Sequence, residues 1–395
     1  MPELGKEPLW RQVTQAGGAC FRTDGDGAKQ WRDLLAYQPT AGFVVEDISE
    51  LTALIDFIAS HGSNLCGGYF SYDLGRELMG VPTRHTPRFP LAVIYAFDSW
   101  VEYREGKAFQ HGQPWIIDSF EDARSPETAS LNFSPGLSKP AYASTINRIH
   151  EYIRAGDFYQ LNFTQQLKVT STGVVDYPGL LQKHPAAHAM SMHFDDVKIH
   201  SLSPELFLHY SEGRLLTEPI KGTRPRGQGQ VEDDAFRQAL MSSEKEQAEL
   251  FMITDLLRND LGMVCEVGSI ALEAVKDIRK LPRVWHTFSR ISGRLHQKLE
   301  PLEALMTMLP GGSITGCPKK HSMEIIDLLE GESRDIYTGN LGYFHPEGDF
   351  SFNIAIRTLV QKGKTLSLGS GGGITIDSHW EDEWQELLVK ASTFK

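Results

Sequence analysis

The segment that decides the fold runs from Ser351 to Ser392, SFNIAIRTLVQKGKTLSLGSGGGITIDSHWEDEWQELLVKAS. Its first half contains two strand-like runs, SFNIAIRTLV and KTLSLGS. Three glycines, Gly371 to Gly373, then lead through ITID into a helix predicted from about Glu381 to Ser392. Strands that follow one another before a helix are typical of antiparallel sheets, not of a regular parallel strand-helix repeat.

The segments upstream fit the same fold class. Ile146, Ile149 and Ile153 predict a helix from about Tyr142 to Ala155, which ends at Gly156. The run YQLNFTQ alternates apolar residues with amides and a hydroxyl, which predicts a strand. The pattern alone indicates an ordinary strand with one exposed face. A long helical stretch is predicted from Asp233 to about Asn259. Long strands that alternate irregularly with a few long helices indicate an α+β fold.

A joint between two regions is predicted at DSFEDARSPETASLNFSPGLSKP, residues 118–140, which is rich in Ser, Pro and acidic residues. We therefore expect an N-terminal α+β subregion, 1–120, packed on the catalytic part, then a linker, 121–139, and a catalytic region, 140–395.

Composition excludes several classes of protein. The chain has 395 residues, and 39 Lys plus Arg against 51 Asp plus Glu give a net charge of −12, which argues against nucleic acid as a partner. The apolar run Leu91 to Phe97 falls far short of the roughly 20 residues that a spanning helix needs, so no membrane segment is expected. The N-terminus has no secretion pattern and the four cysteines form no CxxC pair, so a cytoplasmic protein is expected.

Two predicted helices carry paired carboxylates. Glu383 and Glu386 stand at i and i+3, with Lys390 on the same face of the last helix. Glu246 and Glu249 have the same spacing in the long helix. Carboxylates that converge from two helices suit a hard cation, and Mg2+ is the natural occupant. The alternative for either pair alone is a solvated helix surface.

Other segments suit anion binding or nucleophilic chemistry. Lys221, in EPIKGTRPRG, could act as a nucleophile if it lost its proton, helped by burial or by neighbouring Arg224 or Arg226; the alternative is a basic surface turn. The glycines of GSGGGITIDS and of PGGSITGCPKK could bring main-chain N–H groups to an anion, or simply make tight turns. Arg357 is a lone cation on an apolar strand, and His286 is either a core histidine or an orienting group.

Ten blocks, in order along the chain, closely resemble the chorismate-utilising enzymes. They are QLNFTQ, SPELF, EPIKGTRPRG, SEKEQAELFMITDLLRNDLG, WHTFSRISGRL, LPGGSITGCPK, IYTGNLGY, NIAIRT, GSGGGITIDS and EDEWQE. The resemblance covers about residue 140 to the C-terminus, with a weaker echo upstream in CGGYFSYDLGR. It implies one large chorismate-binding-type α+β domain, in which two antiparallel sheets flanked by helices enclose one Mg2+ and one chorismate.

The resemblance also implies roles for single residues. Glu249 and Glu386 are the expected metal ligands, with Glu383 at or just outside them and Glu246 behind. Lys221 is the expected nucleophile, Glu205 the general acid, and His286 an orienting residue. The residues expected to contact substrate are Gln160, Tyr337, Arg357, Gly371, Gly372, Gly373 and Lys390, together with Ser313 or Thr315.

Two positions distinguish the members of the family. Isochorismate and salicylate synthases carry a lysine base where this chain has Gln160, so water activation at C2 is not expected. Anthranilate synthase has PIAGT, whereas aminodeoxychorismate synthase has PIKGT, as here with Lys221. The resemblance therefore implies amination of chorismate to 4-amino-4-deoxychorismate, a step of 4-aminobenzoate and folate biosynthesis, through a covalent lysine intermediate.

The ammonia must come from another protein. None of Cys20, Cys66, Cys265 and Cys317 lies in a glycine-flanked elbow, so a separate glutamine amidotransferase subunit is the expected partner. The alternatives are an anthranilate synthase component I, for which Lys221 would be a bystander, and a non-catalytic anion-binding subunit. A module that binds phosphate or nucleic acid is a third alternative.

Overall fold

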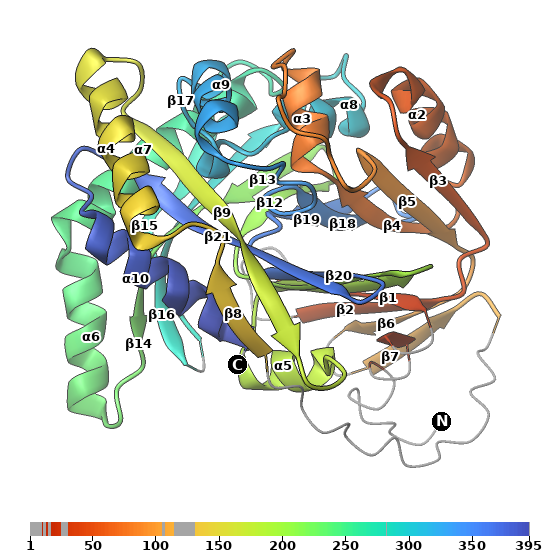
Figure 1. Cartoon of the computed structure of the whole chain (residues 1–395). Coiled ribbons are helices and arrows are strands. Elements are labelled where there is room, and N and C mark those ends of the chain that lie inside the picture. The colour runs from red at the N-terminus through yellow and green to blue at the C-terminus, as the bar shows by residue number, and fades with distance from the viewer. Residues whose placement is uncertain are drawn as a thin grey trace.

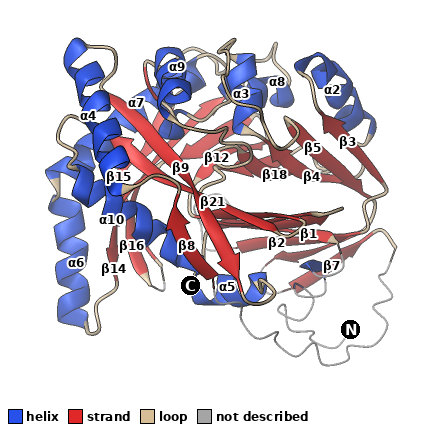
Figure 2. Ribbon diagram, viewed as in Figure 1, coloured by secondary structure: helices blue, strands red, loops and turns tan. Residues whose placement is uncertain are grey.

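The computed structural model describes residues 10, 13–14, 17–24, 31–104, 107–113, 131–281 and 283–394. Two large antiparallel sheets lie one above the other in Figure 1, and helices flank them at one side and along the top. Figure 2 shows the same arrangement by secondary structure. The predicted α+β class with two antiparallel sheets flanked by helices is confirmed.

In the part of the chain that the structure describes, the first sheet contains eleven strands. Its hydrogen-bonded order is β17 (Gly316–Cys317), β9 (Gln160–Ser171), β21 (Thr365–Ile374), β20 (Thr358–Lys362), β11 (Val197–Ser203), β10 (His188–Phe194), β1 (Gly18–Asp24), β2 (Trp31–Tyr37), β6 (Trp100–Arg104) and β7 (Lys107–His111), and β8 (Leu131–Pro135) also pairs with β9.

The second sheet contains ten strands among the described residues. Its order is β14 (Ile220–Pro225), β16 (Val284–Arg294), β13 (Arg214–Glu218), β12 (Leu206–Ser211), β19 (Phe350–Asn353), β18 (Asn340–Phe344), β4 (Leu65–Phe70), β5 (Ala92–Phe97) and β3 (Ala41–Val45), and β15 (Ala271–Lys280) also pairs with β16.

The helices cover the outer faces of the two sheets (Figure 1). The α-helices in the described part of the chain are α2 (Leu51–Ser60), α3 (Tyr72–Leu78), α4 (Lys139–Ala155), α5 (Tyr177–Lys183), α6 (Gln230–Ser242), α7 (Glu244–Gly262), α8 (Pro301–Met308), α9 (Lys319–Leu329) and α10 (Trp380–Ala391). α10 packs on β21 and α4, whereas α6 and α7 pack on β14 and β16.

Strands from both predicted regions share each sheet. β1, from residues 1–120, pairs with β10, and β4 pairs with β18. The predicted linker, 121–139, lies largely outside the described residues, and the division of the chain there stays a prediction.

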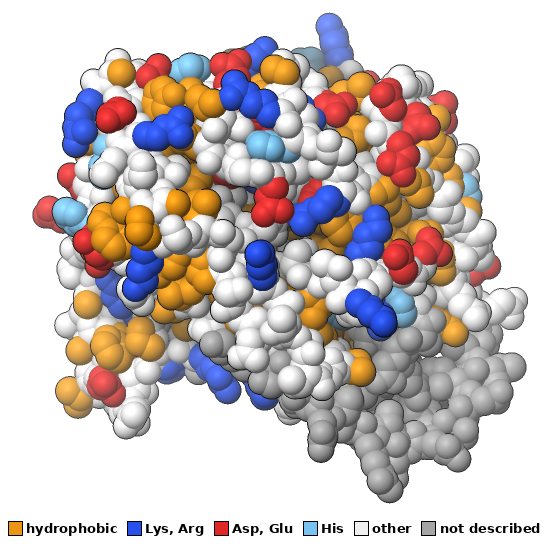
Figure 3. Space-filling view, in the orientation of Figure 1, with side chains coloured by type: hydrophobic (Ala, Val, Ile, Leu, Met, Phe, Trp, Pro, Cys, Tyr) orange, Lys and Arg blue, Asp and Glu red, His pale blue; other side chains and the backbone are white. Residues whose placement is uncertain are grey.

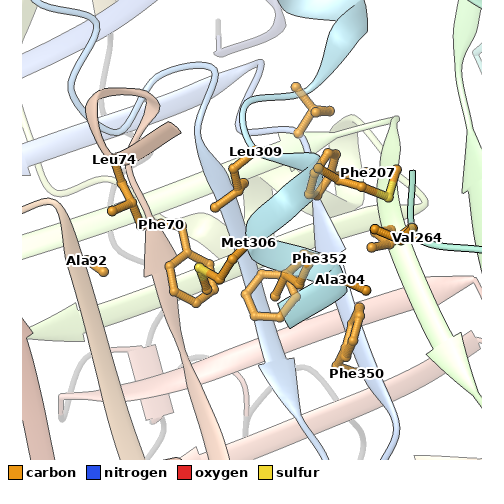
Figure 4. Packing of buried hydrophobic residues seen from close by; sticks show 14 of the residues in the cluster. Phe70, Leu74, Ala92, Phe207, Val264, Ala304, Met306, Leu309, Phe350 and Phe352 are labelled. Atoms are coloured by element: carbon orange, nitrogen blue, oxygen red, sulfur yellow. The ribbon is translucent and has the colours of Figure 1, made fainter. Parts of the chain in front are cut away.

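Apolar side chains fill the space between each sheet and its helices. Phe70, Phe207, Phe350 and Phe352 are each at most 2% exposed and belong to the cluster under α3 and α8 (Figure 4). A second cluster joins β9 to α4 and α10 through residues such as Phe163. Burial on this scale anchors the helices that carry the polar groups discussed below.

Two of the connections at which the chain passes from one sheet to the other are neighbours. Glu205 lies between β11 of the first sheet and β12 of the second, and residues 354–357 connect β19 back to β20. The Ile354 N–H donates to the Glu205 carbonyl at 3.1 Å, and the Leu202 N–H donates to the Arg357 carbonyl at 2.9 Å. The two connections are therefore fixed side by side.

Three local predictions differ from the structure. The predicted helix 233–259 is two helices that are separated at Ser243. The backbone of Ser243 is extended, and its side chain caps the N-terminus of α7. The predicted strand SFNIAIRTLV is two strands, and Arg357 lies between them with φ 47° instead of on a strand. Gly371 to Gly373 lie inside β21, paired with Thr164 to Asn162 of β9, so they do not form a turn.

Candidate active site

A cavity of about 880 Å3 opens where the two sheet connections face α7 and α10. Nearly every candidate site residue lines it. They are Glu205, Lys221, Glu246, Glu249, His286, Ser313, Tyr337, Arg357, Gly371, Gly372, Gly373, Glu383, Glu386 and Lys390. Residues that lie up to 185 positions apart in the sequence therefore face one space.

Glu205 is the buried carboxyl of this cavity. It is 6% exposed, and the Ser313 hydroxyl donates to its Oε1 at 2.6 Å. Burial raises the pKa of Glu205, because the charged form loses hydration, and the hydrogen bond from Ser313 opposes that shift. The positive charges of Lys221 and Lys390 oppose it further. A carboxyl with a raised pKa is suited to give a proton to a leaving group.

His286 presents a neutral ring to the cavity. Burial lowers its pKa to about 3, and the positive charge of Arg357 lowers it further. Nδ1 lies 2.8 Å from the Thr223 hydroxyl, whereas Nε2 is buried without a hydrogen-bond partner among the described residues. A histidine that stays uncharged through the neutral range can orient a substrate group by a hydrogen bond.

Lys221 lies on β14, an edge strand of the second sheet, and not in a turn. Its positive charge partly opposes the raised pKa of Glu205 and contributes to the lowered pKa of Glu386, and all three residues line the cavity. No ion pair holds that amine within the described ranges.

The neighbouring arginines do not play the part expected from the sequence. Arg224 Nη1 lies 2.7 Å from Glu246 Oε1, and Arg226 forms an ion pair with Asp233 at 2.5 Å. Each arginine is matched by its own carboxylate, so neither is a free positive charge beside Lys221.

The two carboxylate pairs approach from opposite helices. Glu246 and Glu249 project from α7, and Glu383 and Glu386 project from α10. Burial raises the pKa of Glu383, partly opposed by a hydrogen bond from Ser378. The Lys390 ammonium, 2.7 Å from Glu386 Oε1, lowers the pKa of Glu386.

The donor set is one that Mg2+ accepts. All four groups are carboxylates, and Glu246 Oε2 is buried without a hydrogen-bond partner in the described structure. A Cβ on Gly372 would stand 3.4 Å from Glu383 Oε2 and 3.9 Å from Glu386 Oε1, so the glycine leaves room beside both. Among the described residues, no three His, Cys, Asp or Glu lie close enough together to hold a metal ion by themselves. Mg2+ commonly takes only one or two carboxylates and completes its shell with water and substrate, so these residues fit it.

The cavity lining also carries cationic and polar groups for an anion, namely Arg357, Lys390 and Tyr337. Burial lowers the pKa of Arg357, and within the described ranges no carboxylate pairs with it. Lys390 Nζ donates to the Gly371 carbonyl at 2.8 Å. The Tyr337 hydroxyl is buried, which raises its pKa and keeps it a neutral donor.

Two sequence predictions fall outside the cavity lining. Gln160 is buried, and its amide stands where a Cβ on Gly373 would be, 2.1 Å from Nε2, so it packs behind the glycine strand. Thr315 donates to the main chain of its own turn, whereas Ser313 faces the cavity. Of the two hydroxyls left open by the sequence, Ser313 is the one in position to meet a ligand.

Asn162 and Lys245 are among the lining residues that the sequence reasoning missed. Asn162 lines the cavity from β9, and the alternation of amides in QLNFTQ was a usable signal. Lys245 lines it beside Glu246, and its charge helps to lower the pKa of Glu386. A lysine next to an acidic helix turn carries no pattern that would have distinguished it from a solvated residue.

The face drawn in Figure 3 mixes Lys and Arg with Asp and Glu, and no basic field dominates it. Among the described residues, no helix has the length and apolar character needed to cross a membrane.

Comparison with known proteins covers nearly the whole chain. Residues 19–395 match the family described as chorismate binding enzyme. An anthranilate synthase component 1 from Haloarcula marismortui is 34% identical over 435 residues, 96% of this chain and 87% of that protein. An aminodeoxychorismate synthase component 1 from Klebsiella aerogenes is 34% identical over 338 residues, 82% of this chain and 75% of that protein.

A solved structure agrees with the fold. The crystal structure of anthranilate synthase component I from Streptococcus pneumoniae superposes with a TM-score of 0.80 at 25% identity, over 94% of this chain and 93% of that one. The two sequence relatives have the same identity to this chain, so identity does not separate their two activities.

Proposed function

This chain belongs to the family of chorismate binding enzymes, and we propose that it aminates chorismate at C4 to give 4-amino-4-deoxychorismate. The observation that carries the proposal is the place of Lys221. Lys221 lines the same cavity as Glu205 and Glu386, at the position where the anthranilate synthase motif has alanine. A lysine that faces the substrate space is available as a nucleophile.

The proposed reaction has two substitutions. The Lys221 nitrogen bonds to C2 of chorismate while the C4–O bond breaks, and protonated Glu205 gives its proton to the departing hydroxyl, which leaves as water. Ammonia then bonds to C4 and the C2–N bond to Lys221 breaks, so the amine takes the place of the hydroxyl. Neutral His286 orients the hydroxyl, and does not transfer a proton.

Arg357 and Lys390 would bind the two carboxylates of the substrate, while the Ser313 hydroxyl keeps its hydrogen bond to Glu205. Glu249 and Glu386 would hold Mg2+, with Glu383 beside them and Glu246 behind. The cation would offset the charge of the ring carboxylate and withdraw electrons from the ring. Lys390 would then leave Glu386, to which it is paired in the free protein, and turn to the substrate.

A glutamine amidotransferase subunit is the proposed source of ammonia, and free ammonium should substitute for it in vitro. We propose a cytoplasmic enzyme of 4-aminobenzoate and folate biosynthesis.

Incubation with chorismate, Mg2+ and ammonium tests the proposal. We expect 4-amino-4-deoxychorismate, which an added lyase converts to 4-aminobenzoate. The anthranilate synthase relatives favour a second candidate, and anthranilate fluorescence with pyruvate release would establish it instead. A chain that consumes no chorismate would be the non-catalytic subunit.

A further inference from the structure

A buried ion pair lies behind the cavity and does not line it. Arg334 Nε lies 2.8 Å from Glu330 Oε2 and Nη2 lies 2.7 Å from Oε1, so the pair is bidentate. The two side chains are 2% and 6% exposed. Replacing such a buried pair by apolar residues is often neutral or stabilising, so stability alone is a weak reason for it.

The pair ties strand β9 to the turn that follows α8. Arg334 donates to the Ile314 carbonyl at 2.7 Å through Nη1 and to the Asn162 carbonyl at 2.6 Å through Nη2. Glu330 Oε1 accepts from the N–H and the hydroxyl of Thr164, at 2.8 and 2.9 Å. One guanidinium therefore fixes two backbone segments that are 152 positions apart.

The turn is Gly312–Ile314, and it carries Ser313. The Asn162 side chain donates to the Ile314 carbonyl at 3.1 Å, and the Asn162 N–H donates to the Thr315 carbonyl at 2.7 Å. Ser313, at the centre of this turn, donates to Glu205. Hydrogen bonds to the Ile314 carbonyl, the backbone of the turn and the Ser313 hydroxyl thus connect the ion pair to the proposed general acid.

We infer that Arg334 and Glu330 are positioning residues of the active site: they fix the Gly312–Ile314 turn, and through Ser313 they fix the carboxyl of Glu205. The inference rests on the proposed function, in which Glu205 is the proton donor. A planar fork with five donors can hold a carboxylate and two carbonyls at once, which the three donors of a lysine ammonium on a flexible stem cannot do in the same geometry. The Tyr72 ring, 4.6 Å from the guanidinium carbon, fixes the plane of the fork.

Arg334→Lys tests the inference, with the rate of chorismate consumption measured against pH. The rate should fall about 10- to 100-fold, because a small misplacement of a reacting group has this cost. The alkaline limb of the pH–rate profile, where the rate falls as Glu205 loses its proton, should move to higher pH. The reason is that the Ser313 hydrogen bond favours the ionised form of Glu205, so its loss raises the pKa of Glu205, while the charges of Lys221 and Lys390 still act on it. Ser313→Ala should give the same shift, and the double variant should add none.

Two comparisons separate positioning from simple support of the fold. Arg22→Lys is the control, because it changes another bidentate pair, in which Arg22 lies 2.8 and 3.1 Å from the carboxylate oxygens of Asp33. It should lower the melting temperature without moving the alkaline limb of the pH–rate profile. An unmoved limb in Arg334→Lys, or shifts that add in the double variant, would overturn the inference. A crystal structure of Arg334→Lys should show the Ser313–Glu205 hydrogen bond broken, and an intact hydrogen bond would overturn the inference. This test does not depend on activity. It can therefore be made even if the wild-type protein consumes no chorismate and the proposed function is disproved.

Discussion

The two walls of the cavity hold their polar groups in different ways. The buried wall, made of Glu205, Ser313 and His286, is at most 8% exposed; Ser313 is hydrogen-bonded to Glu205, and His286 to Thr223 of the neighbouring strand. The helical wall consists of the glutamates of α7 and α10 with Lys390. There Glu383 is 8% exposed, whereas Glu386 and Lys390 have side chains 56% and 34% exposed and are paired with each other.

This difference indicates a division of labour. Groups fixed in a desolvated wall keep shifted pKa values and a set direction, which proton transfer and orientation require. Groups on an open wall can exchange one charged partner for another at low cost, which binding of a cation and an anionic substrate requires. The proposed mechanism places its acid on the first wall and its metal on the second.

Glu205→Gln, in the buried wall, should have the largest effect on the rate of reaction. The amide keeps the shape of the side chain but cannot give a proton, so the rate should fall by about 10²- to 10⁴-fold. The control is the binding of chorismate by calorimetry, which should change little. A rate within about threefold of wild type would remove Glu205 from the acid role.

Lys221→Ala should abolish the covalent adduct and slow the reaction by about 100-fold or redirect it. Intact-protein mass spectrometry after incubation with chorismate and no ammonia detects the adduct. Lys221→Arg keeps the charge without a comparable nucleophile and should also form none. An adduct at the wild-type level in either variant would refute the assignment.

Glu249→Ala tests the helical wall. Loss of one carboxylate should weaken Mg2+ binding by about 10- to 100-fold, measured by calorimetry and by metal titration of activity. Glu244→Ala, on the exposed start of α7, is the matched control and should leave the titration unchanged. Identical titration curves for the two variants would exclude Glu249 as a ligand.

Acid should lower the free energy of unfolding mainly through buried histidines of the interior, and less through the helical wall. Burial lowers the pKa of His188, His200 and His286 to about 3, from an ordinary value near 6.5. The stability that this contributes is present above pH 6.5 and is lost as pH falls toward 3, because the unfolded chain takes up the protons. The free energy of unfolding should decrease by up to about 1.4 kcal/mol per pH unit for each histidine.

Urea denaturation between pH 7 and pH 4 measures this slope. His200→Gln should flatten it by one histidine. A wild-type stability that does not change over this range would contradict the assignment of three neutral buried histidines.

Local chemistry was predictable where it depends on spacing along one element. The helix ending at Gly156 is confirmed, with φ 88° at that glycine, and the carboxylates of α10 share one face as the i, i+3 spacing requires. The strand YQLNFTQ was predicted correctly as a strand, but its polar side is buried too, because Asn162 and Thr164 satisfy their groups internally.

Sheet membership was not predictable in the same way. The pattern SFNIAIRTLV suits a strand throughout, and nothing in it shows that the chain changes sheets before Arg357. Gln160 was placed at the substrate by position in a motif, whereas packing turns it behind Gly373.

The sequence by itself determined the period of each element, the faces that carry carboxylates, and, through ordered motifs, the family to which the chain belongs. Only the tertiary structure decided that Glu205 and Arg357 meet at paired connections between the sheets, and that Arg334 supports Ser313 from behind. The reason is physical: hydrophobic periodicity acts over a few residues, whereas the partners of a buried polar group are chosen by pairings between strands far apart in the chain.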